Sequence, residues 1–225
     1  MNLKLIARMH TDFPTKFGIP RQPGLVDGLE AEVVFEPEYR NPDAVRGLDG
    51  FSHIWIIWGF SAVKRENWTA TVRPPRLGGN VRMGVFATRS PFRPNPVGIS
   101  SVRLLSVNLN DPRGPVLRVA GADMMDKTPV YDIKPYVPIS DAHPDAVGGF
   151  ADAQKTRRLR VTFPDEWMGM IPLEKRAALI GVLENDPRPS YQNDPDRRYG
   201  FAFAGCDVRF HVDGDALTVC EIVKL

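Results

Sequence analysis

Residues 51–63 read FSHIWIIWGFSAV, the most apolar stretch of this 225-residue chain. A membrane-spanning helix needs about 20 consecutive apolar residues, and this stretch is shorter and contains His53 and two serines. We therefore predict no membrane span and instead a strand at residues 53–60, bounded by turn-forming residues. His53 is interpreted as a histidine of the core rather than a metal ligand.

Short apolar runs separated by proline and glycine continue on both sides of this strand. The chain has 21 prolines and 19 glycines, and in the first 140 residues they leave no room for long helices. Seven short strands indicate a mainly β fold, either a barrel or a sandwich. They are predicted at residues 4–9, 30–35, 53–60, 83–87, 101–107, 116–120 and 130–133. A single helical turn is expected at residues 42–45, because Asn41 suits a helix cap and Pro42 the first helical position.

The composition changes after this β region. Residues 140–154 (SDAHPDAVGGFADAQ) are small and polar, which is typical of a linker or a mobile loop. We predict a first domain at 1–141, a linker at 142–154 and a small α+β domain at 155–225. In the second domain, residues 172–186 have helical apolar spacing, and residues 208–222 form a hairpin turning at Asp213 and Gly214.

Composition and cysteine usage restrict the class of protein. The chain is 43% hydrophobic and 25% charged with a mean hydropathy of -0.24, as in ordinary soluble globular proteins. Cys206 and Cys220 form no CxxC pattern, and the four histidines are scattered. These features argue against a disulfide scaffold and a metal site, and favour a reducing, cytoplasmic environment. No export signal is visible.

The distribution of charge is more informative than the net charge of +2. Residues 64–103 carry eight basic residues and one acid, Glu66, whereas residues 1–63 carry eight acids and six bases. Such a segment attracts phosphates or carboxylates, so an anionic partner is one interpretation. The alternative is a solvated basic face.

Rigid turns rich in proline and arginine are the remaining signal. The chain has no GxGxxG and no GxxxxGK[ST], so neither a Rossmann site nor a P-loop is expected. Residues 19–25, 73–79, 87–98 and 128–138 combine fixed prolines with arginine, lysine or glycine. Such loops can hold guanidinium groups and bare amides in a preset geometry. They indicate a preformed anionic or nucleotide site, or else prolines that prevent edge strands from pairing.

Several of these motifs resemble the TrmO family, also called TsaA-like or YaeB-like proteins. The motifs are IPRQPGL at 19–25, GLDGFSHIWIIWGF at 47–60, VRPPRLGGNVRMGVFATRSPFRPNPVGIS at 72–100 and TPVYDIKPYVP at 128–138. The resemblance is close over residues 3–141 and looser beyond, where DPRPSY at 186–191 is similar to a second family signature. It implies a single-sheet antiparallel β-barrel and a homodimeric, S-adenosylmethionine-dependent methyltransferase. The implied substrate is N6 of threonylcarbamoyladenosine, next to the anticodon of tRNA.

The resemblance also implies which residues bind S-adenosylmethionine. They are Pro23, Gly24, Leu25, Ser61, Ala62, Arg89, Ile99, Ala120, Gly121, Ala122 and Asp123. Arg89 can pair with the methionyl carboxylate and Asp123 can bond a ribose hydroxyl. The alternatives are a structural Arg89 and an alanine-rich stretch that belongs only to the barrel core.

Two positions depart from the family pattern. Ser61 and Ala62 stand where the family usually has His-Gln, so two side chains that can contact the cofactor are lost. Lys127 stands in place of a glycine, which changes either the turn geometry or the charge of the pocket. A catalytically reduced relative is therefore an alternative.

The expected chemistry needs a base more than a metal. The methyl on a sulfonium is already electrophilic, whereas the conjugated N6 has a poor lone pair, so removing its proton should help. Candidate bases are Asp126 and Asp132, with Tyr136 as an orienting hydroxyl. The alternative is that Asp132 pairs with Lys134 or Arg93 and only stiffens the loop.

Cationic residues are the candidates for binding the tRNA anticodon stem-loop. Arg93 and Lys134 could pair with the threonyl carboxylate, and a buried arginine left unpaired would reject the unmodified base. Arg73, Arg76 and Arg82 would contact phosphates, and Arg188 and Tyr191 would add a phosphate contact and a stacking surface. Two rival functions are a non-catalytic barrel that binds RNA or senses S-adenosylmethionine, and a methyltransferase of a small metabolite.

Overall fold

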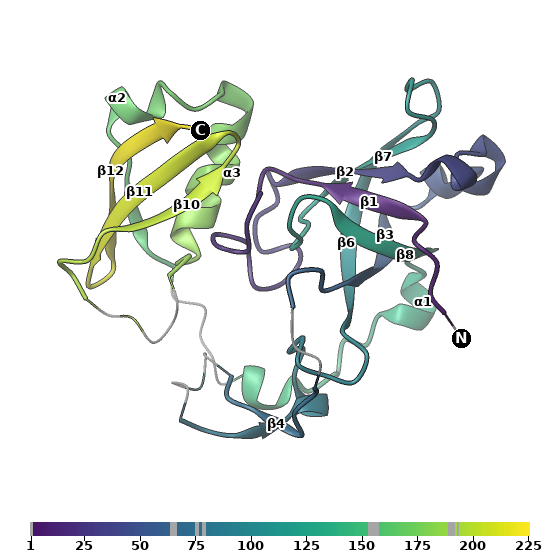
Figure 1. The fold of residues 1–225 in the computed structure, drawn as a ribbon, viewed down its shortest axis with the longest axis horizontal. Helices are drawn as coiled ribbons and strands as arrows, with labels where there is room; N and C mark the ends of the chain where they lie inside the picture. The colour runs from purple at the N-terminus through teal and green to yellow at the C-terminus, as the bar shows by residue number, and fades with distance from the viewer. Residues whose placement is uncertain are drawn as a thin grey trace.

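The computed structural model describes residues 2–63, 67–74, 77, 80–152, 158–188, 192 and 194–225. A β-barrel and a smaller sheet with helices lie side by side (Figure 1). The predicted mainly β fold with an α+β C-terminal part is confirmed.

The N-terminal unit has six strands and closes on itself to form a barrel. Its strands are β1 (Ala7–His10), β2 (Glu30–Phe35), β3 (His53–Gly59), β6 (Val97–Asn108), β7 (Val116–Ala120) and β8 (Thr128–Pro135). They pair antiparallel in the order β1-β2-β7-β6-β3-β8, and β8 returns to β1. Closure leaves no unpaired edge, so the barrel rather than the sandwich is correct.

Strand β3 shows how the sequence builds the barrel interior. Ile54, Ile56 and Trp58 are buried and face inward, as the period of two in a strand requires. The predicted range 53–60 agrees closely with the observed strand. Strand β6 begins four residues before its prediction, because Val97 and Gly98 pair with Gly59 and Trp58.

A bulge in β8 decides which of its side chains face outward. Ile57 pairs with Asp132 but Trp58 pairs with Val130, so Tyr131 is an extra residue. Val130 and Ile133 can therefore both pack against the core. As a result, Asp132 lies on the outer surface of the barrel.

The basic segment, residues 64–103, contains a small two-stranded unit. Its strands are β4 (Thr71–Val72) and β5 (Met83–Gly84). The strand predicted at 83–87 is wrong beyond Gly84, because Val85–Ala87 form the 3-10 helix η5. The Val85 carbonyl accepts hydrogen bonds from the Thr88 backbone N–H and hydroxyl, which turns the chain.

Other short helices lie in the N-terminal part and the segment that follows it. They are η1 (Pro37–Tyr39), η2 (Pro42–Val45), η3 (Leu48–Gly50), α1 (Pro138–Asp141) and η6 (Gly149–Ala151). In η2, the Asn41 side chain accepts from Asp43 N, as expected of a cap.

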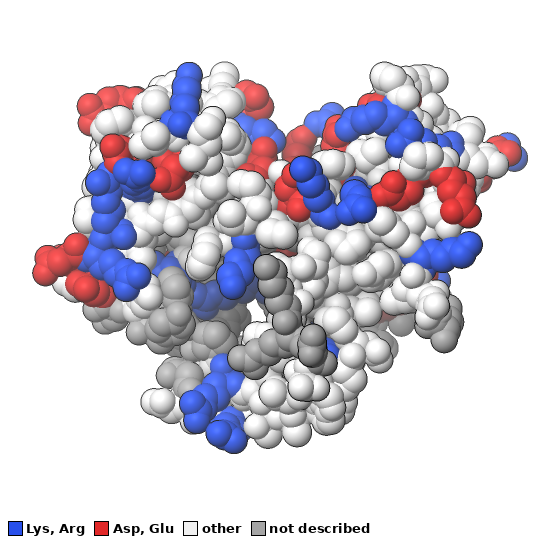
Figure 2. All heavy atoms as spheres, viewed as in Figure 1, with Lys and Arg blue, Asp and Glu red and all other residues white. Residues whose placement is uncertain are grey.

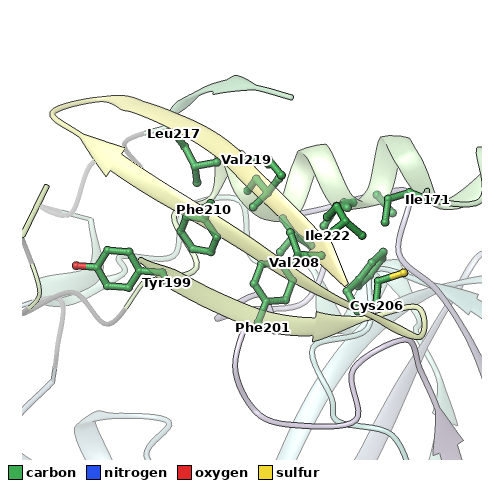
Figure 3. Close-up of a cluster of buried hydrophobic side chains, with 14 of the residues drawn as sticks. Ile171, Tyr199, Phe201, Cys206, Val208, Phe210, Leu217, Val219 and Ile222 are labelled. Carbon is green, nitrogen blue, oxygen red and sulfur yellow. The ribbon is translucent and has the colours of Figure 1, made fainter. Parts of the chain in front are cut away.

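The C-terminal part is a four-stranded sheet covered by a helix. Strands β9 (Arg160–Thr162), β10 (Tyr199–Phe203), β11 (Cys206–Asp213) and β12 (Ala216–Lys224) have the order β10-β11-β12-β9. Helices α2 (Asp165–Met168) and α3 (Leu173–Glu184) complete it. The predicted helix and the β11-β12 hairpin are confirmed, whereas β9 and β10 were not predicted. Figure 3 shows Phe201, Val208, Phe210, Val219 and Ile222 in the buried cluster of this sheet.

The segment between β1 and β2 joins the two parts of the molecule. Phe13, Val26 and Leu29 belong to the same buried cluster as α3 and the C-terminal sheet. A Cβ added to Gly18 would lie 2.3 Å from the Phe201 ring. The N-terminal segment thus supplies part of the core of the C-terminal region.

Across the described ranges, every helix is too short or too polar to traverse a lipid bilayer. Cys206 is buried, Cys220 is partly buried, and both are free thiols.

Candidate active site

Two loops implicated in cofactor binding meet at the barrel. Gly24 N donates a 2.9 Å hydrogen bond to the Gly121 carbonyl. A Cβ on Gly121 would lie only 3.0 Å from the Gly24 Cα, and both glycines have positive φ, +74° and +80°. Bare backbone is therefore required where residues 23–25 approach residues 120–123.

The carboxylate of Asp123 lies beside this contact and is held from the barrel wall. Ser100 Oγ donates to Asp123 Oδ1 at 2.6 Å, and Trp58 Nε1 donates to Ser100 Oγ at 3.0 Å. Burial raises the pKa of Asp123, and the Ser100 hydrogen bond and the charge of Arg89 oppose this shift without cancelling it. Asp123 is thus held by the barrel wall, and because its pKa is raised, a further hydrogen-bond donor would stabilise its charged form.

Arg89 reaches the same cluster from the basic segment. Its Nη1 donates to Gln22 Oε1 at 2.6 Å, and its charge acts on Asp123. The guanidinium remains exposed to solvent. The structure therefore brings Arg89, residues 22–25 and residues 121–123 together, although the sequence separates them widely.

The other cofactor candidates lie around this end of the barrel. Ser61 and Ala62 follow β3 and are exposed, next to Phe60, whose ring lies 4.4 Å from that of Trp58. Ala120 and Ala122 are buried, as core residues would be. Their side chains face packed protein, which agrees with the alternative that this stretch belongs to the barrel core.

One candidate base lies on the outer face of the barrel near Ile99. Ile57 pairs with Ile99 on one side and with Asp132 on the other. At the usual strand spacing this places Ile99 and Asp132 about 10 Å apart. Lys134 Nζ forms a 2.9 Å ion pair with Asp132 Oδ2, which agrees with the alternative interpretation of Asp132.

Asp126 lies in a different environment. Its Oδ1 accepts from Thr11 N at 3.3 Å and lies 3.3 Å from His10 Nδ1. It lines a cavity of about 690 Å³ with residues of β1, β2 and α3, including Glu30, Glu32, Glu174 and Lys175. The cofactor candidates do not line this cavity, so Asp126 is best explained as a tether of the N-terminal segment.

Tyr136 lies at the opposite end of β3 from Trp58. Its N–H donates to the His53 carbonyl, and its ring centroid is 5.6 Å from that of Trp55. Four extended residues separate it from Asp132 by about 13 Å. The three catalytic candidates therefore do not form one constellation.

The comparisons with known proteins identify the family. Residues 8–142 match the tRNA-methyltransferase O N-terminal domain and residues 156–225 match the TrmO C-terminal domain. The chain belongs to the TrmO family.

Its similarity to individual TrmO relatives extends over nearly the whole chain. It is 41% identical over 215 residues to the tRNA (adenine(37)-N6)-methyltransferase of Escherichia coli (strain K12), covering 92% of this chain and 91% of the relative. A Pseudomonas aeruginosa protein, named as an S-adenosylmethionine-dependent methyltransferase, is 39% identical over 214 residues, or 92% and 90% of the two chains. The crystal structure of TrmO from Pseudomonas aeruginosa superposes with a TM-score of 0.79 at 30% identity, covering 99% of this chain and 98% of that one.

Lys127 departs from the TrmO pattern, but its backbone has the left-handed conformation that glycine favours. Its φ is +62°, and its N–H donates to the Met9 carbonyl at 2.8 Å. The turn geometry is therefore retained, and the exposed side chain adds a positive charge.

The candidate RNA-binding residues of this TrmO chain differ in availability. Arg73 and Arg82 are exposed at one end of the β4-β5 unit, next to the pair of Val72 and Met83. Figure 2 shows Lys and Arg atoms, and no Asp or Glu atoms, at the lower edge where Figure 1 labels β4. Arg76 and Tyr191 lie outside the described residues.

Arg93 and Arg188 are largely occupied by protein partners. Arg93 Nη2 donates to the carbonyls of Val85 and Thr88 at 3.1 and 2.8 Å. Arg188 is buried, and two of its nitrogens donate to the Asp186 carboxylate at 2.8 and 2.9 Å. Within the described part of the chain, Arg93 Nε and Arg188 Nη1 have no partner.

Two functional side chains escaped the sequence analysis. Trp58 was predicted only as a strand residue, and Ser100 lay just before the strand predicted at 101–107, yet they fix Asp123. The available signal was a hydroxyl at an inward position of a strand, where it must find partners. Among the described residues, no group of three or more His, Cys, Asp and Glu could hold a metal ion.

Proposed function

We propose that this protein is an S-adenosylmethionine-dependent tRNA methyltransferase that methylates N6 of the adenine at position 37, next to the anticodon. The observation that carries the proposal is the meeting of Gly24, Gly121, Asp123 and Arg89 in a chain of the TrmO family. The Escherichia coli relative is named for this reaction.

The residues at this end of the barrel fit the cofactor. Arg89 offers a cation for the methionyl carboxylate, and Asp123 offers an acceptor for a ribose hydroxyl. Gly24 is exposed, which leaves its backbone accessible to a ligand, and the half-exposed Ile99 offers an apolar contact. S-adenosylmethionine supplies a methyl group on a sulfonium, which is electrophilic without a metal.

The protein's part in the chemistry is positioning and proton removal. Asp132 is the best-placed base, because it lies on the same outer row as Ile99 and is partly exposed. It would accept the N6 proton as the methyl group is transferred. Asp126 and Tyr136 are separated from this row and are proposed to have structural roles.

The modified base is the proposed substrate, and the position of Lys134 supports this proposal. The threonyl group of threonylcarbamoyladenosine carries a carboxylate, and Lys134 is exposed beside Asp132. Arg93 remains the second candidate, although one of its nitrogens already donates to two carbonyls. A cation that pairs with the threonyl carboxylate would favour the modified over the unmodified base, and Lys134 would have to exchange its ion pair with Asp132 for that contact.

The proposal includes features that the TrmO family implies. The protein is proposed to be a cytoplasmic homodimer, with residues 1–141 as the catalytic domain and 155–225 as the small domain. Arg73, Arg76 and Arg82 would contact phosphates of the anticodon stem-loop.

Methyl transfer from labelled S-adenosylmethionine tests this function. We expect label only in tRNA that carries the threonylcarbamoyl group, and loss of cofactor binding in Arg89→Ala by calorimetry. Binding without transfer would instead support the RNA-binding or sensing alternative. Transfer independent of tRNA would support a small-metabolite methyltransferase.

A further inference from the structure

Two aromatic side chains are exposed together in the basic segment. The rings of Trp68 and Phe86 are stacked, with centroids 6.2 Å apart and planes at 22°. The residues are 50% and 75% exposed, respectively. Large aromatic side chains are seldom left in solvent as a pair unless they contact a partner.

The backbone under this pair is held firmly. Val85 is buried, its N–H donates to the Ala70 carbonyl, and its own carbonyl accepts from Thr88. Arg93 bonds the carbonyls of Val85 and Thr88, which bracket Phe86. The position of Phe86 is thus set before a partner binds, so little entropy is lost on binding.

The Trp68 side is tied to the same framework. Thr69 N donates to the Phe92 carbonyl, and Ala70 accepts from Val85. Both sides of the aromatic pair therefore depend on one network of backbone hydrogen bonds. This network also explains the role of Arg93 in the fold.

The charge around the pair favours a nucleic acid over an apolar protein surface. Residues 67–110 contain no Asp or Glu, and Arg73 and Arg82 are exposed on the adjacent β4-β5 unit. An apolar partner would need only the rings. The combination of stacked rings with arginines that form no ion pair among the described residues is what unpaired nucleotides require, since bases stack on aromatic rings while phosphates pair with cations.

We infer that Trp68 and Phe86 form a stacking platform for an unpaired base of the anticodon loop, while Arg73 and Arg82 contact the adjoining phosphates. This inference rests on the proposed function for the identity of the RNA. It adds a binding site for a loop base to the proposed cofactor site around Asp123.

Leucine substitutions separate stacking from general apolar contact. Phe86→Leu and Trp68→Leu keep apolar volume but lose the ring, whereas Phe86→Tyr keeps it. Phe17→Leu is the matched control, because Phe17 is also an exposed aromatic residue at 52% but lies outside the basic segment. The readout is the Kd for a synthetic anticodon stem-loop RNA, measured by fluorescence anisotropy at several salt concentrations.

We expect both platform variants to weaken RNA binding about 5- to 100-fold. The salt dependence should not change, because no phosphate contact is lost. Phe86→Tyr and Phe17→Leu should stay within about twofold of the wild type. Calorimetry should show unchanged affinity for S-adenosylmethionine in all four variants.

RNA with single abasic positions in the loop identifies the stacked base. One abasic position should weaken binding to the wild type but not to Phe86→Leu, since the contact is already lost there. Wild-type affinity in both leucine variants, or additive losses at every abasic position, would overturn the inference.

Two controls distinguish loss of base stacking from dissociation of subunits and from failure of the proposed function. Sedimentation of Phe86→Leu should show the same oligomeric state as the wild type, whereas dissociation would assign the aromatic pair to a contact between copies and overturn the platform. If wild-type protein methylates tRNA but the platform variants bind RNA normally, only the platform is refuted. If wild-type protein binds the stem-loop through the platform without methyl transfer, the proposed function fails and the platform stands.

Discussion

The Ser100 hydroxyl donates a 2.6 Å hydrogen bond to the Asp123 carboxylate and so joins the barrel wall to the loop that follows β7. The same oxygen accepts from Trp58 Nε1. Ser100 is 1% exposed, so water cannot replace these partners. A single hydroxyl thereby satisfies a buried indole and orients the carboxylate of the candidate cofactor site.

Ser100→Ala should lower the free energy of unfolding by about 1–3 kcal/mol, because it leaves the Trp58 N–H and Asp123 without this partner. Urea unfolding followed by fluorescence measures the change. The neighbouring Ser101→Ala is the control and should stay within about 0.5 kcal/mol. Equal losses in the two variants would contradict the role assigned to the hydroxyl.

Asp123→Asn should become more stabilising, relative to the wild type, as the pH rises. Burial raises the pKa of Asp123, so the folded protein binds the proton of the Asp123 carboxyl group more tightly than the unfolded chain does. That contribution to stability is complete below the ordinary pKa of 3.8 and is lost as the pH rises through the raised value. Thermal unfolding at acidic and neutral pH checks the trend.

The opposite sign is expected at Asp111, which serves as the comparison. Hydrogen bonds from Arg113 lower the pKa of Asp111 to about 2. Its contribution is present above the ordinary value and disappears as the pH falls, so Asp111→Asn should destabilise only at the higher pH. The same pH trend in both variants would refute the assignment for Asp123.

Lys127→Gly should stabilise the protein by about 0.5–1 kcal/mol. The φ of +62° strains a residue with a Cβ, and relief of this strain exceeds the extra entropy of glycine in the unfolded chain. Lys127→Ala removes the charge but keeps the Cβ, so it should give no gain. Chemical unfolding of the three proteins decides between strain and charge.

Gly18→Ala should cost about 2 kcal/mol or more. The φ of Gly18 is +84°, and an added Cβ would lie 2.3 Å from the Phe201 ring, where the N-terminal segment packs on the C-terminal sheet. Gly205→Ala is matched, since φ is +75° but nothing lies within 4 Å. Its cost should be only about 1 kcal/mol, measured by the same unfolding experiment.

Asp132→Asn should reduce kcat about 100-fold or more if Asp132 removes the N6 proton. The KM for S-adenosylmethionine should change little. Asp126→Asn is the comparison and should lower stability while preserving kcat. Loss of kcat in Asp126→Asn alone would reverse the assignment.

Much of the barrel follows from local sequence. Strands β2 and β7 occupy their predicted residues, because turn-forming residues bound each apolar run. The Asn41 cap and the helix after Pro172 also follow from neighbouring residues. Strands β9 and β10 lack such signals, since β9 is short and is held by its pairing with β12.

The sequence by itself determined most strands of the barrel, the family and the cationic segment, because apolar alternation, motif spacing and charge are properties of neighbouring residues. Only the tertiary structure decided that Ser100 holds Asp123, that the bulge at Tyr131 turns Asp132 outward, and that Asp126 lines a cavity that the cofactor candidates do not line. Those relationships depend on strand register and on barrel closure, which bring together residues far apart in the chain. Packing sets the distances between side chains, and a local sequence pattern does not predict them.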